Sequence, residues 1–360
     1  FNWLAEFYQI IHDNGGFDVI IGNPPYVVYN KKNVPYHIIN YQTLETANLY
    51  SYVFERSKCI SRGLIGLIVQ MSAVGTEGMR PLQQFLLESF KQIHYGCYPE
   101  RPQQLFDGVC IALAIFIVSQ YGRGQIFGAG VNRVSEGARD TLFRRLSYVS
   151  ISRQDFLRDY LLFPKFNQIL EKHLFAKLST NHKISQYLGA DKTNMLAYRS
   201  AGGRYWKIVL NRPFANDSTS NKIKFLSSEI SSFELVSILN SNLFWWYYVN
   251  FFDLYNFGDY MIFHFLYESN GGEESTALTQ YGRDLMASYE ANKVENTQFI
   301  KSKQHLSVFE SFNPSKSKPI IDEIDKVLAK HYGFTDEELD FIINYDIKYR
   351  MGDELNGDGE

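Results

Sequence analysis

Long apolar runs, paired cysteines and clustered histidines are all missing from this 360-residue sequence. The longest apolar run, Val109 to Val118, has the length of a strand and falls short of the roughly 20 residues of a membrane-spanning helix, so we expect no membrane partner. The three cysteines (Cys59, Cys97 and Cys110) are an odd number at unrelated spacings, which excludes a disulfide framework and indicates a reducing, cytoplasmic compartment. The eight histidines are isolated, so we expect no metal site.

Signature motifs of several enzyme classes are absent as well. The sequence has no GxSxG nucleophile elbow and no Walker phosphate loop. Asp346 and Lys348 have an acid-x-Lys spacing, but no Pro-Asp partner of a nuclease site accompanies them. The chain begins at Phe1 without a methionine or a basic leader, so we expect neither a secreted precursor nor a complete gene product.

The composition is that of a folded protein with abundant aromatic residues. Hydrophobic residues make up 45% and charged residues 21% of the sequence, far from the composition of a disordered chain. The 25 tyrosines and 28 phenylalanines are available for packing or for stacking on bases. The length predicts two or three domains.

The small net charge of −3 conceals an uneven distribution. Residues 121–225 contain 18 Lys and Arg against 7 Asp and Glu, whereas the last 55 residues contain 13 acids and 6 bases. A basic middle between acidic ends favours one module that faces a polyanion, although scattered solvated charge is the alternative explanation.

The first 120 residues alternate between strand and helix patterns. Apolar runs bounded by Gly and Pro predict strands, and apolar residues three and four apart predict helices. The predicted elements, in order, are a strand at 17–21 buried on both faces, a helix at 46–60 stopped by Gly63, a strand at 64–70, a helix at 81–90, and antiparallel strands at 93–98 and 109–118. This order predicts an α/β fold, half of a doubly wound Rossmann-like sheet with an antiparallel edge.

Beyond Gln120 the periodicity weakens, and only the end of the chain is clearly helical. We interpret the glycines between Gly122 and Gly130 as turns, and Trp245 and Trp246 as core residues. A helical segment at 318–349 is predicted from Pro319 at a helix start and from a capping box formed by Thr335 and Glu338.

The most informative residues are Asn23, Pro24, Pro25 and Tyr26, directly after the first predicted strand. Ligands of open α/β sheets bind outside the carboxyl ends of the strands, which is where these four residues fall. The two proline rings restrict the backbone, so the Pro24 carbonyl is held in a fixed direction beside the side-chain oxygen of Asn23. Two converging acceptors suit an amino group with two hydrogens to donate, and Tyr26 adds a flat face for stacking.

This arrangement suits methylation of the exocyclic amine of adenine. The N6 lone pair is delocalised into the ring, and two hydrogen bonds accepted from its protons make it available to a methyl donor. No carboxylate base is required, and Asp18 at the start of the strand is the only acid nearby. Because the target lies inside a duplex, the base must be flipped out.

The segment FDVIIGNPPY, with FNWLAEF before it and ANLYSYVFERS after it, resembles the catalytic motif of adenine-N6 DNA methyltransferases of type II and type IIG restriction-modification systems. The resemblance implies transfer of methyl from S-adenosylmethionine, catalysis by Asn23 to Tyr26, and cofactor contacts from Asn23 and Pro25. The stretch LFDGVCIALAIFIV is similar to the last strand of the family's sheet, whose preceding loop can place an aromatic beneath the flipped adenine. Phe106 is the candidate, with ordinary core packing as the alternative.

A second set of candidates lies in the basic region, where residues 198–207 combine cations, glycines and aromatics. Glycines let a backbone approach closely, and Arg and Lys bind phosphates or guanine edges. This stretch and residues 238–248 resemble the family's target-recognition domain. The residues that we expect to contact double-stranded DNA are Arg199, Gly202, Gly203, Arg204 and Lys207.

The family's cofactor loop, an Asp-Pro-x-x-Gly-x-Gly-like turn, is absent before Asn23. We therefore expect only the second half of a methyltransferase sheet, inactive alone, with the missing amino-terminal half or a nuclease domain as a further partner. The predicted organisation is an incomplete catalytic domain at 1–140, an α+β target-recognition domain at 141–300 and a helical tail at 301–360. The alternative function is a non-catalytic, sequence-specific DNA-binding subunit with a vestigial bend at Asn23.

Overall fold

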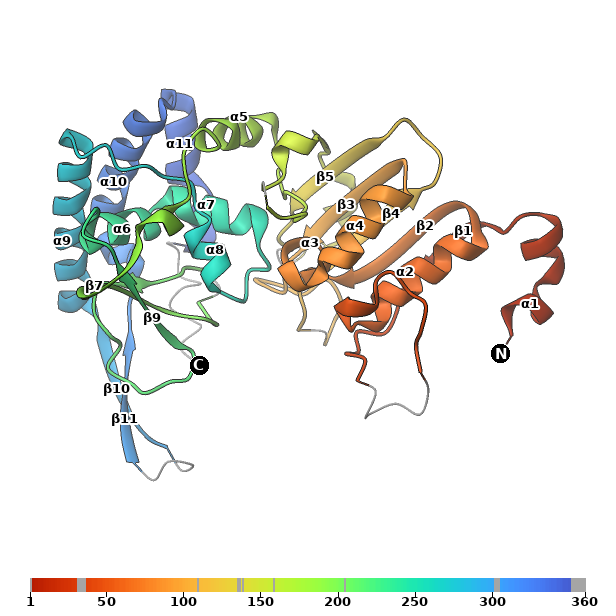
Figure 1. The fold of residues 1–360 in the computed structure, drawn as a ribbon, viewed down its shortest axis with the longest axis horizontal. Helices are drawn as coiled ribbons and strands as arrows, with labels where there is room; N and C mark the ends of the chain where they lie inside the picture. Colours follow the sequence, from red (N-terminus) through yellow and green to blue (C-terminus); the bar gives the residue numbers. More distant parts are fainter. Residues whose placement is uncertain are drawn as a thin grey trace. The chain divides into compact units, whose positions relative to one another are not determined.

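The computed structural model describes residues 2–30, 37–108, 110–134, 137, 139–157, 159–203, 205–300 and 305–350. The chain forms two compact units (Figure 1). The first contains Phe1–Lys172 and Val249–Asp253, and the second contains His173–Tyr248 and Leu254–Glu360. The chain thus divides after Lys172, whereas the functional segments expected from the sequence divide after residues 140 and 300. Those segments stay a prediction about function.

A six-stranded mixed sheet forms the centre of the first unit. Its strands are β1 (Phe17–Gly22), β2 (Ser61–Gln70), β3 (Gln92–Tyr98), β4 (Leu113–Ser119), β5 (Gln125–Val131) and β6 (Val149–Ile151). Their spatial order is β1-β2-β4-β3-β5-β6, with β1 parallel to β2, β3 parallel to β5, and the other neighbours antiparallel. The predicted mixed α/β class is confirmed.

Helices cover one face of this sheet (Figure 1). They are α2 (Leu49–Ile60), α3 (Ser72–Gly75) and α4 (Arg80–Ser89), and Phe54 of α2 packs edge to face on Phe116 of β4 with centroids 5.8 Å apart. On the same face Leu67 and Val118 are buried. The short helices of this unit are α1 (Trp3–Glu6), a π-helix (Gln9–Asp13) and the 3-10 turns Leu44–Thr46, Glu77–Met79, Arg139–Arg144 and Arg153–Asp155.

The first strand differs from its prediction, because β1 is an exposed edge rather than a strand buried on both faces. Among the described residues it pairs only with β2, and Val19 and Ile21 are 53% and 83% exposed. The register aligns Val19 with Leu64 of β2, and Gly66 of β2 lies between Ile21 and Ile117 of β4. These four exposed apolar side chains therefore share the sheet face opposite α2.

Glycines account for two further corrections. Gly63 does not stop α2, which ends at Ile60; it lies inside β2, where a side chain would collide with the Asp18 carbonyl oxygen. The glycines at 128 and 130 are not turns but lie within β5. The antiparallel edge is consequently β6, which the sequence did not predict, and β4 lies inside the sheet.

The second unit combines a small sheet with a helical layer. Its sheet has the order β8-β7-β9, built from β7 (Leu188–Arg199), β8 (Val209–Leu210) and β9 (Asn221–Leu226). Beside it lie a separate two-stranded ribbon, β10 (Val294–Ile300) and β11 (His305–Ser311), and the helices α6 (Ser232–Leu239), α8 (Asp259–Phe263), α9 (Glu273–Asn292), α10 (Lys318–Tyr332), α11 (Asp336–Asn344) and α12 (Ile347–Arg350). The 3-10 turns are Ile184–Tyr187 and Pro314–Ser317, and α5 (Ile169–Leu178) and α7 (Asn242–Phe251) contain residues of both units.

Two expectations for the second unit, one about its core and one about a helix start, are confirmed. Trp245 and Trp246 are buried core residues, and the capping box of Thr335 and Glu338 starts α11. In the described part of the chain, no helix has the length and apolarity to cross a membrane. The same residues contain no group of His, Cys, Asp and Glu that could hold a metal ion.

Candidate functional site

Three strands end at one edge of the central sheet, and the candidate catalytic residues follow two of them. The parallel strands β1 and β2 end at Gly22 and Gln70. Leu113 at the start of β4 pairs with both Gln70 and Tyr98, the end of β3. The bend from Asn23 to Tyr26 follows β1, and Phe106 lies in the connection between β3 and β4. The topology thus brings both candidates to the edge at which open α/β sheets bind ligands.

The bend itself lies at the surface, with one residue anchored. Asn23 and Pro25 are exposed, Pro24 is buried and Tyr26 is half-buried. The Tyr26 hydroxyl donates to Asn23 Oδ1 at 2.6 Å and lies 3.2 Å from the carbonyl oxygen of Ile68 in β2. Burial raises the pKa of Tyr26 above its usual value of 10.0, so the hydroxyl keeps its proton at neutral pH and acts as a donor.

Residues just before and just after the start of α2 hold the bend in place through hydrogen bonds and a ring contact. The amide of Leu49 donates to the Val27 carbonyl at 3.1 Å, and the amide of Tyr29 donates to the Ala47 carbonyl at 2.7 Å. The ring of Tyr50, fully buried at the start of α2, meets the Tyr26 ring edge to face at 6.5 Å. Tyr50 thus contacts Tyr26 and helps to position it. It was not among the site residues predicted from the sequence, although it lies in the segment ANLYSYVFERS that carries part of the family resemblance.

The acceptors expected from the sequence are present and largely free. Within the described part of the chain, no group donates to the Pro24 carbonyl, and the Asn23 Nδ2 group has no partner. Asn23 Oδ1 accepts one hydrogen bond from Tyr26, and an amide oxygen has a second lone pair. Asp18 lies at the other end of β1, where it pairs with Arg62 at 2.9 Å. Among the described residues the bend thus has two acceptors with unused capacity, and their joint contact with one amine stays a prediction.

Phe106 is partly exposed on a loop that Arg139 holds in place through hydrogen bonds. It is 40% exposed, whereas its neighbour Leu105 is buried in the cluster of Tyr98, Leu113, Val134 and Leu142, against which Tyr26 also packs. Arg139 donates to Asp107 Oδ1 at 2.8 Å and to the Gln104 carbonyl at 3.0 Å, one contact on each side of Phe106. Leu105, not Phe106, is the core residue of this loop. A contact of Phe106 with a base stays a prediction.

The candidate DNA-binding segment, residues 198–207, contains a turn, and its lysine, Lys207, is buried. Lys207 is only 4% exposed, and its ammonium group donates to the carbonyls of Gly202 and, at 3.1 Å, Tyr255. The same ammonium lies 5.1 Å from the centre of the Tyr248 ring. In this conformation the buried ammonium group of Lys207 stabilises the turn, and its expected contact with DNA stays a prediction.

The other described members of this segment differ in exposure, because Gly203 is exposed whereas Arg199 and Gly202 are half-buried. Gly202 and Gly203 adopt left-handed backbone angles (φ +85° and +63°), and a side chain on Gly203 would collide with the Trp206 carbonyl oxygen. The half-buried guanidinium of Arg199 lies over the Phe214 ring at 4.7 Å. Arg204 lies outside the described residues. The glycines are thus explained by the turn, and DNA contact by any residue of this segment stays a prediction.

Comparison with known proteins gives one family match and several distant structures. Residues 1–98 match the family described as Eco57I restriction-modification methylase. The comparison with curated proteins gave no match. Similar solved structures include a modification subunit of a putative type I restriction enzyme from Vibrio vulnificus YJ016 (16% identity, 47% of this chain, 41% of that chain, TM-score 0.32) and the type IIL restriction-modification enzyme MmeI in complex with DNA (11%, 94%, 57%, 0.44).

A third similar structure is the ATP-dependent type ISP restriction-modification enzyme LlaBIII bound to DNA (11% identity, 93% of this chain, 36% of that chain, TM-score 0.38). The chain spans less than two thirds of the length of each of these three proteins. The segment from the amino terminus to the end of β3, which contains the bend from Asn23 to Tyr26, is therefore similar to a restriction-modification methylase.

Proposed function

We propose that this chain forms the catalytic and target-recognition part of a site-specific DNA methyltransferase that methylates N6 of a flipped adenine. The observation that carries the proposal is the exposed bend at the carboxyl edge of the sheet, with Asn23 Oδ1 held by Tyr26 and the Pro24 carbonyl free among the described residues. The match of residues 1–98 to a restriction-modification methylase family supports the same class of reaction.

In this mechanism the two acceptors orient and activate the adenine amine. The amine donates one hydrogen to Asn23 Oδ1 and the other to the Pro24 carbonyl, which localises the nitrogen lone pair away from the ring. The nitrogen then forms a bond to the methyl carbon while the bond between that carbon and the donor's sulfur breaks, and the surplus proton on the nitrogen passes to water at this exposed edge of the sheet. Flipping the base costs a few kcal/mol, and stacking on Tyr26 offsets about 1 to 3 kcal/mol of that cost. Phe106 provides a second aromatic surface at the same edge of the sheet.

The residues of the bend fit a role in holding S-adenosylmethionine, which supplies the electrophilic methyl group. The Asn23 Nδ2 group, which has no partner among the described residues, offers a donor, and the exposed Pro25 ring offers an apolar contact. These two residues are too few to enclose a cofactor, so the proposal includes a further partner segment.

We propose that this partner segment covers β1 and the exposed apolar patch beside it on the sheet face opposite α2. Val19, Ile21, Leu64 and Ile117 are exposed on one face, and the outer edge of β1 is unpaired among the described residues. All-parallel sheets are normally covered on both faces, and three of these four residues lie on the parallel pair β1 and β2. Exposed strand edges also favour association. The occupant is the amino-terminal half of the methyltransferase, encoded upstream of Phe1 or as a separate chain.

The proposal is tested by transfer of tritiated methyl groups to DNA, with the amino-terminal half supplied on the same chain or in trans. Asn23→Ala removes one of the two acceptors, so we expect transfer to fall by roughly 100-fold or more while DNA binding is retained. The matched control is Asn14→Ala, an exposed asparagine before the start of β1. Equal transfer by Asn23→Ala and the control would reject the catalytic role and favour the DNA-binding subunit with a vestigial bend.

A further inference from the structure

The strands β10 and β11 form an isolated antiparallel ribbon in the second unit. Seven residue pairs connect them, from Val294 with Ser311 to Ile300 with His305, and no third strand joins them in the described part of the chain. Seven strand residues span roughly 20 Å. Figure 1 shows the ribbon extending away from the helices α9 and α10. The ribbon therefore contributes little to the core of its unit.

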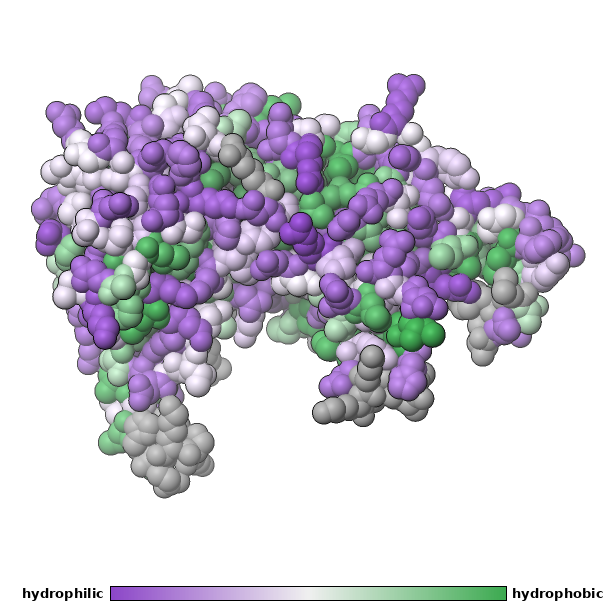
Figure 2. Space-filling model, in the orientation of Figure 1, coloured by the Kyte–Doolittle hydropathy of each residue, from purple (hydrophilic) through white to green (hydrophobic). Residues whose placement is uncertain are grey.

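The ribbon exposes side chains along its length. Residues 294–299 of β10 are all exposed, and Leu306 of β11 is 67% exposed. Figure 2 shows hydrophobic side chains among hydrophilic ones on its surface. A two-stranded ribbon is only marginally stable by itself in water, so its shape must be fixed at its base.

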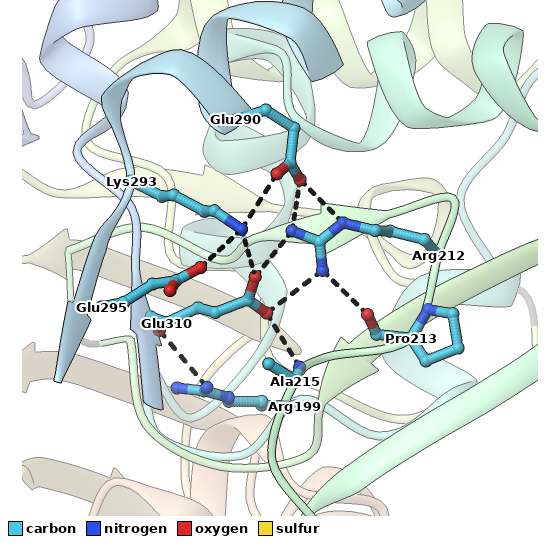
Figure 3. A network of polar contacts seen from close by, with 8 residues as sticks. All are labelled: Arg199, Arg212, Pro213, Ala215, Glu290, Lys293, Glu295 and Glu310. Carbon is cyan, nitrogen blue, oxygen red and sulfur yellow. Dashed lines mark hydrogen bonds and ion pairs between the residues drawn. The ribbon is translucent and has the colours of Figure 1, made fainter. Parts of the chain in front are cut away.

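A network of charged residues fixes that base (Figure 3). The buried carboxylate of Glu310 accepts from Arg212 Nη2 at 2.7 Å, from the Ala215 amide at 2.9 Å and from Lys293 Nζ at 3.0 Å. Arg212 and Lys293 also pair with Glu290, and Lys293 pairs with Glu295 at 2.8 Å. The ribbon is thus tied to α9 and to the loop after β8.

The same network neutralises the acidic residues of the ribbon. Glu295 and Glu310 are the two carboxylates in the described strands, and each is paired with a cation at the base. The exposed part from Asn296 to Phe299 carries no charge. Phosphates would meet no unpaired carboxylate on this part of the ribbon.

The two faces of the ribbon differ in chemistry. Residues alternate between faces, so Asn296 and Gln298 share one face, while Thr297 and Phe299 lie on the other. The side chains of Asn296 and Gln298 make no hydrogen bond within the described part of the chain, although the backbone of both residues belongs to the ladder. Residues two apart in a strand are separated by roughly 7 Å, which matches two base-pair steps of about 3.4 Å.

We propose that the β10–β11 ribbon enters the major groove of DNA and that Asn296 and Gln298 read the edges of two base pairs that lie two steps apart. The major groove admits a two-stranded ribbon, and Asn and Gln side chains form paired hydrogen bonds with adenine. The inference rests on the proposed function, because it identifies the element that recognises the target of the methyltransferase.

In the test, the 360-residue chain is mixed with a library of random DNA duplexes, and the bound duplexes are sequenced. The wild type is compared with the double variant Asn296→Ala plus Gln298→Ala. Both side chains are exposed, so we expect the double variant to fold normally, as checked by circular dichroism. We expect its preference at one or both of two base pairs that lie two steps apart to weaken by roughly 5- to 150-fold, with non-specific binding unchanged. The control is Gln280→Ala, an exposed glutamine on α9, which should keep the wild-type preference.

Two other outcomes would overturn the inference. If the wild type selects a sequence and the double variant selects the same one with equal affinity, the ribbon does not read DNA, while methyl transfer still tests the proposed function separately. If Phe299→Ser plus Leu306→Ser changes the preference and the first variant does not, the reading face is assigned wrongly. A wild type that binds no duplex contradicts both this inference and DNA as the partner of the chain.

Discussion

Tyr26 combines two properties that separate variants can measure. Its hydroxyl orients Asn23 through the 2.6 Å hydrogen bond, and its ring, packed against Tyr50, offers a stacking face. Tyr26→Phe removes only the hydrogen bond, so we expect methyl transfer to fall by roughly 2- to 10-fold, in line with about 0.5 to 1.5 kcal/mol for one hydrogen bond. Tyr26→Ala also removes the ring, so we expect a further loss equivalent to about 1 to 3 kcal/mol of stacking.

The measurement is the rate of methyl transfer by the chain supplemented with its amino-terminal half. Tyr8→Phe, at an exposed tyrosine before the start of β1, is the matched control and should transfer at the wild-type rate. If Tyr26→Phe and Tyr26→Ala were equally active, the ring would not contribute to base binding.

At the scale of single residues, the sequence predicted which residues lie at the end of β1 better than it predicted the directions of side chains elsewhere. Asn23 to Tyr26 could be placed at a strand end because prolines and a glycine bound a short apolar strand. The direction of Lys207 could not be predicted, because an ammonium group turns inward only where backbone carbonyls from distant residues, here Tyr255, converge on it. Clusters of Lys, Arg and Gly are therefore weak evidence for a nucleic-acid contact until the partners of each cation are known.

At the scale of elements, the charged base of the ribbon predicts a pH-dependent stability. Its hydrogen bonds to Arg212, Ala215 and Lys293 lower the pKa of Glu310 from 4.5 to about 2, although burial opposes the shift. The folded state then binds fewer protons than the unfolded state between pH 2 and 4.5. The stabilisation by Glu310, roughly 3 kcal/mol, is therefore complete above pH 4.5 and is lost as the pH falls through about 2.

This prediction is checked by urea unfolding between pH 2 and 6. Glu310→Gln should lower the free energy of unfolding at pH 6 and flatten its dependence on pH below 4.5. The control Glu295→Gln removes a half-exposed carboxylate that pairs with Lys293, so we expect a change of about 0 to 1 kcal/mol. Equal profiles for the two variants would show that Glu310 does not fix the base of the ribbon.

The elements that the sequence predicted correctly share one property, a strong apolar pattern. The strands β2 and β3 and the helices α2 and α4 follow such patterns, and each was placed within a few residues. The missed β5 contains glycines that permit close packing on Tyr95 and Asn167, and this use of glycine is indistinguishable from a turn in a sequence. The missed ribbon mixes apolar and polar residues, and no regular alternation of apolar residues marks β10. The predicted boundary at 300 fell inside the ribbon.

At the scale of the whole molecule, the uncovered sheet face predicts dependence on a partner. Because Ile21 is 83% exposed, Ile21→Lys removes no buried contact within this chain, and we expect its free energy of unfolding to stay within about 0.5 kcal/mol of the wild type. In the assembled enzyme the lysine would be placed in an apolar interface without a partner charge, which is strongly unfavourable. We therefore expect the variant to lose both co-purification with the amino-terminal half and methyl transfer.

The control is Ile223→Lys, at an exposed isoleucine of β9 in the second unit, which should keep both properties. Because association and stability are measured separately, a misfolded variant cannot imitate the expected result. If Ile21→Lys assembled and transferred methyl groups like the wild type, the face formed by Val19, Ile21, Leu64 and Ile117 would not be where the amino-terminal half docks. The cofactor site would then have to be completed from another side of the sheet, and Asn23 and Pro25 would be poorly placed to contribute to it.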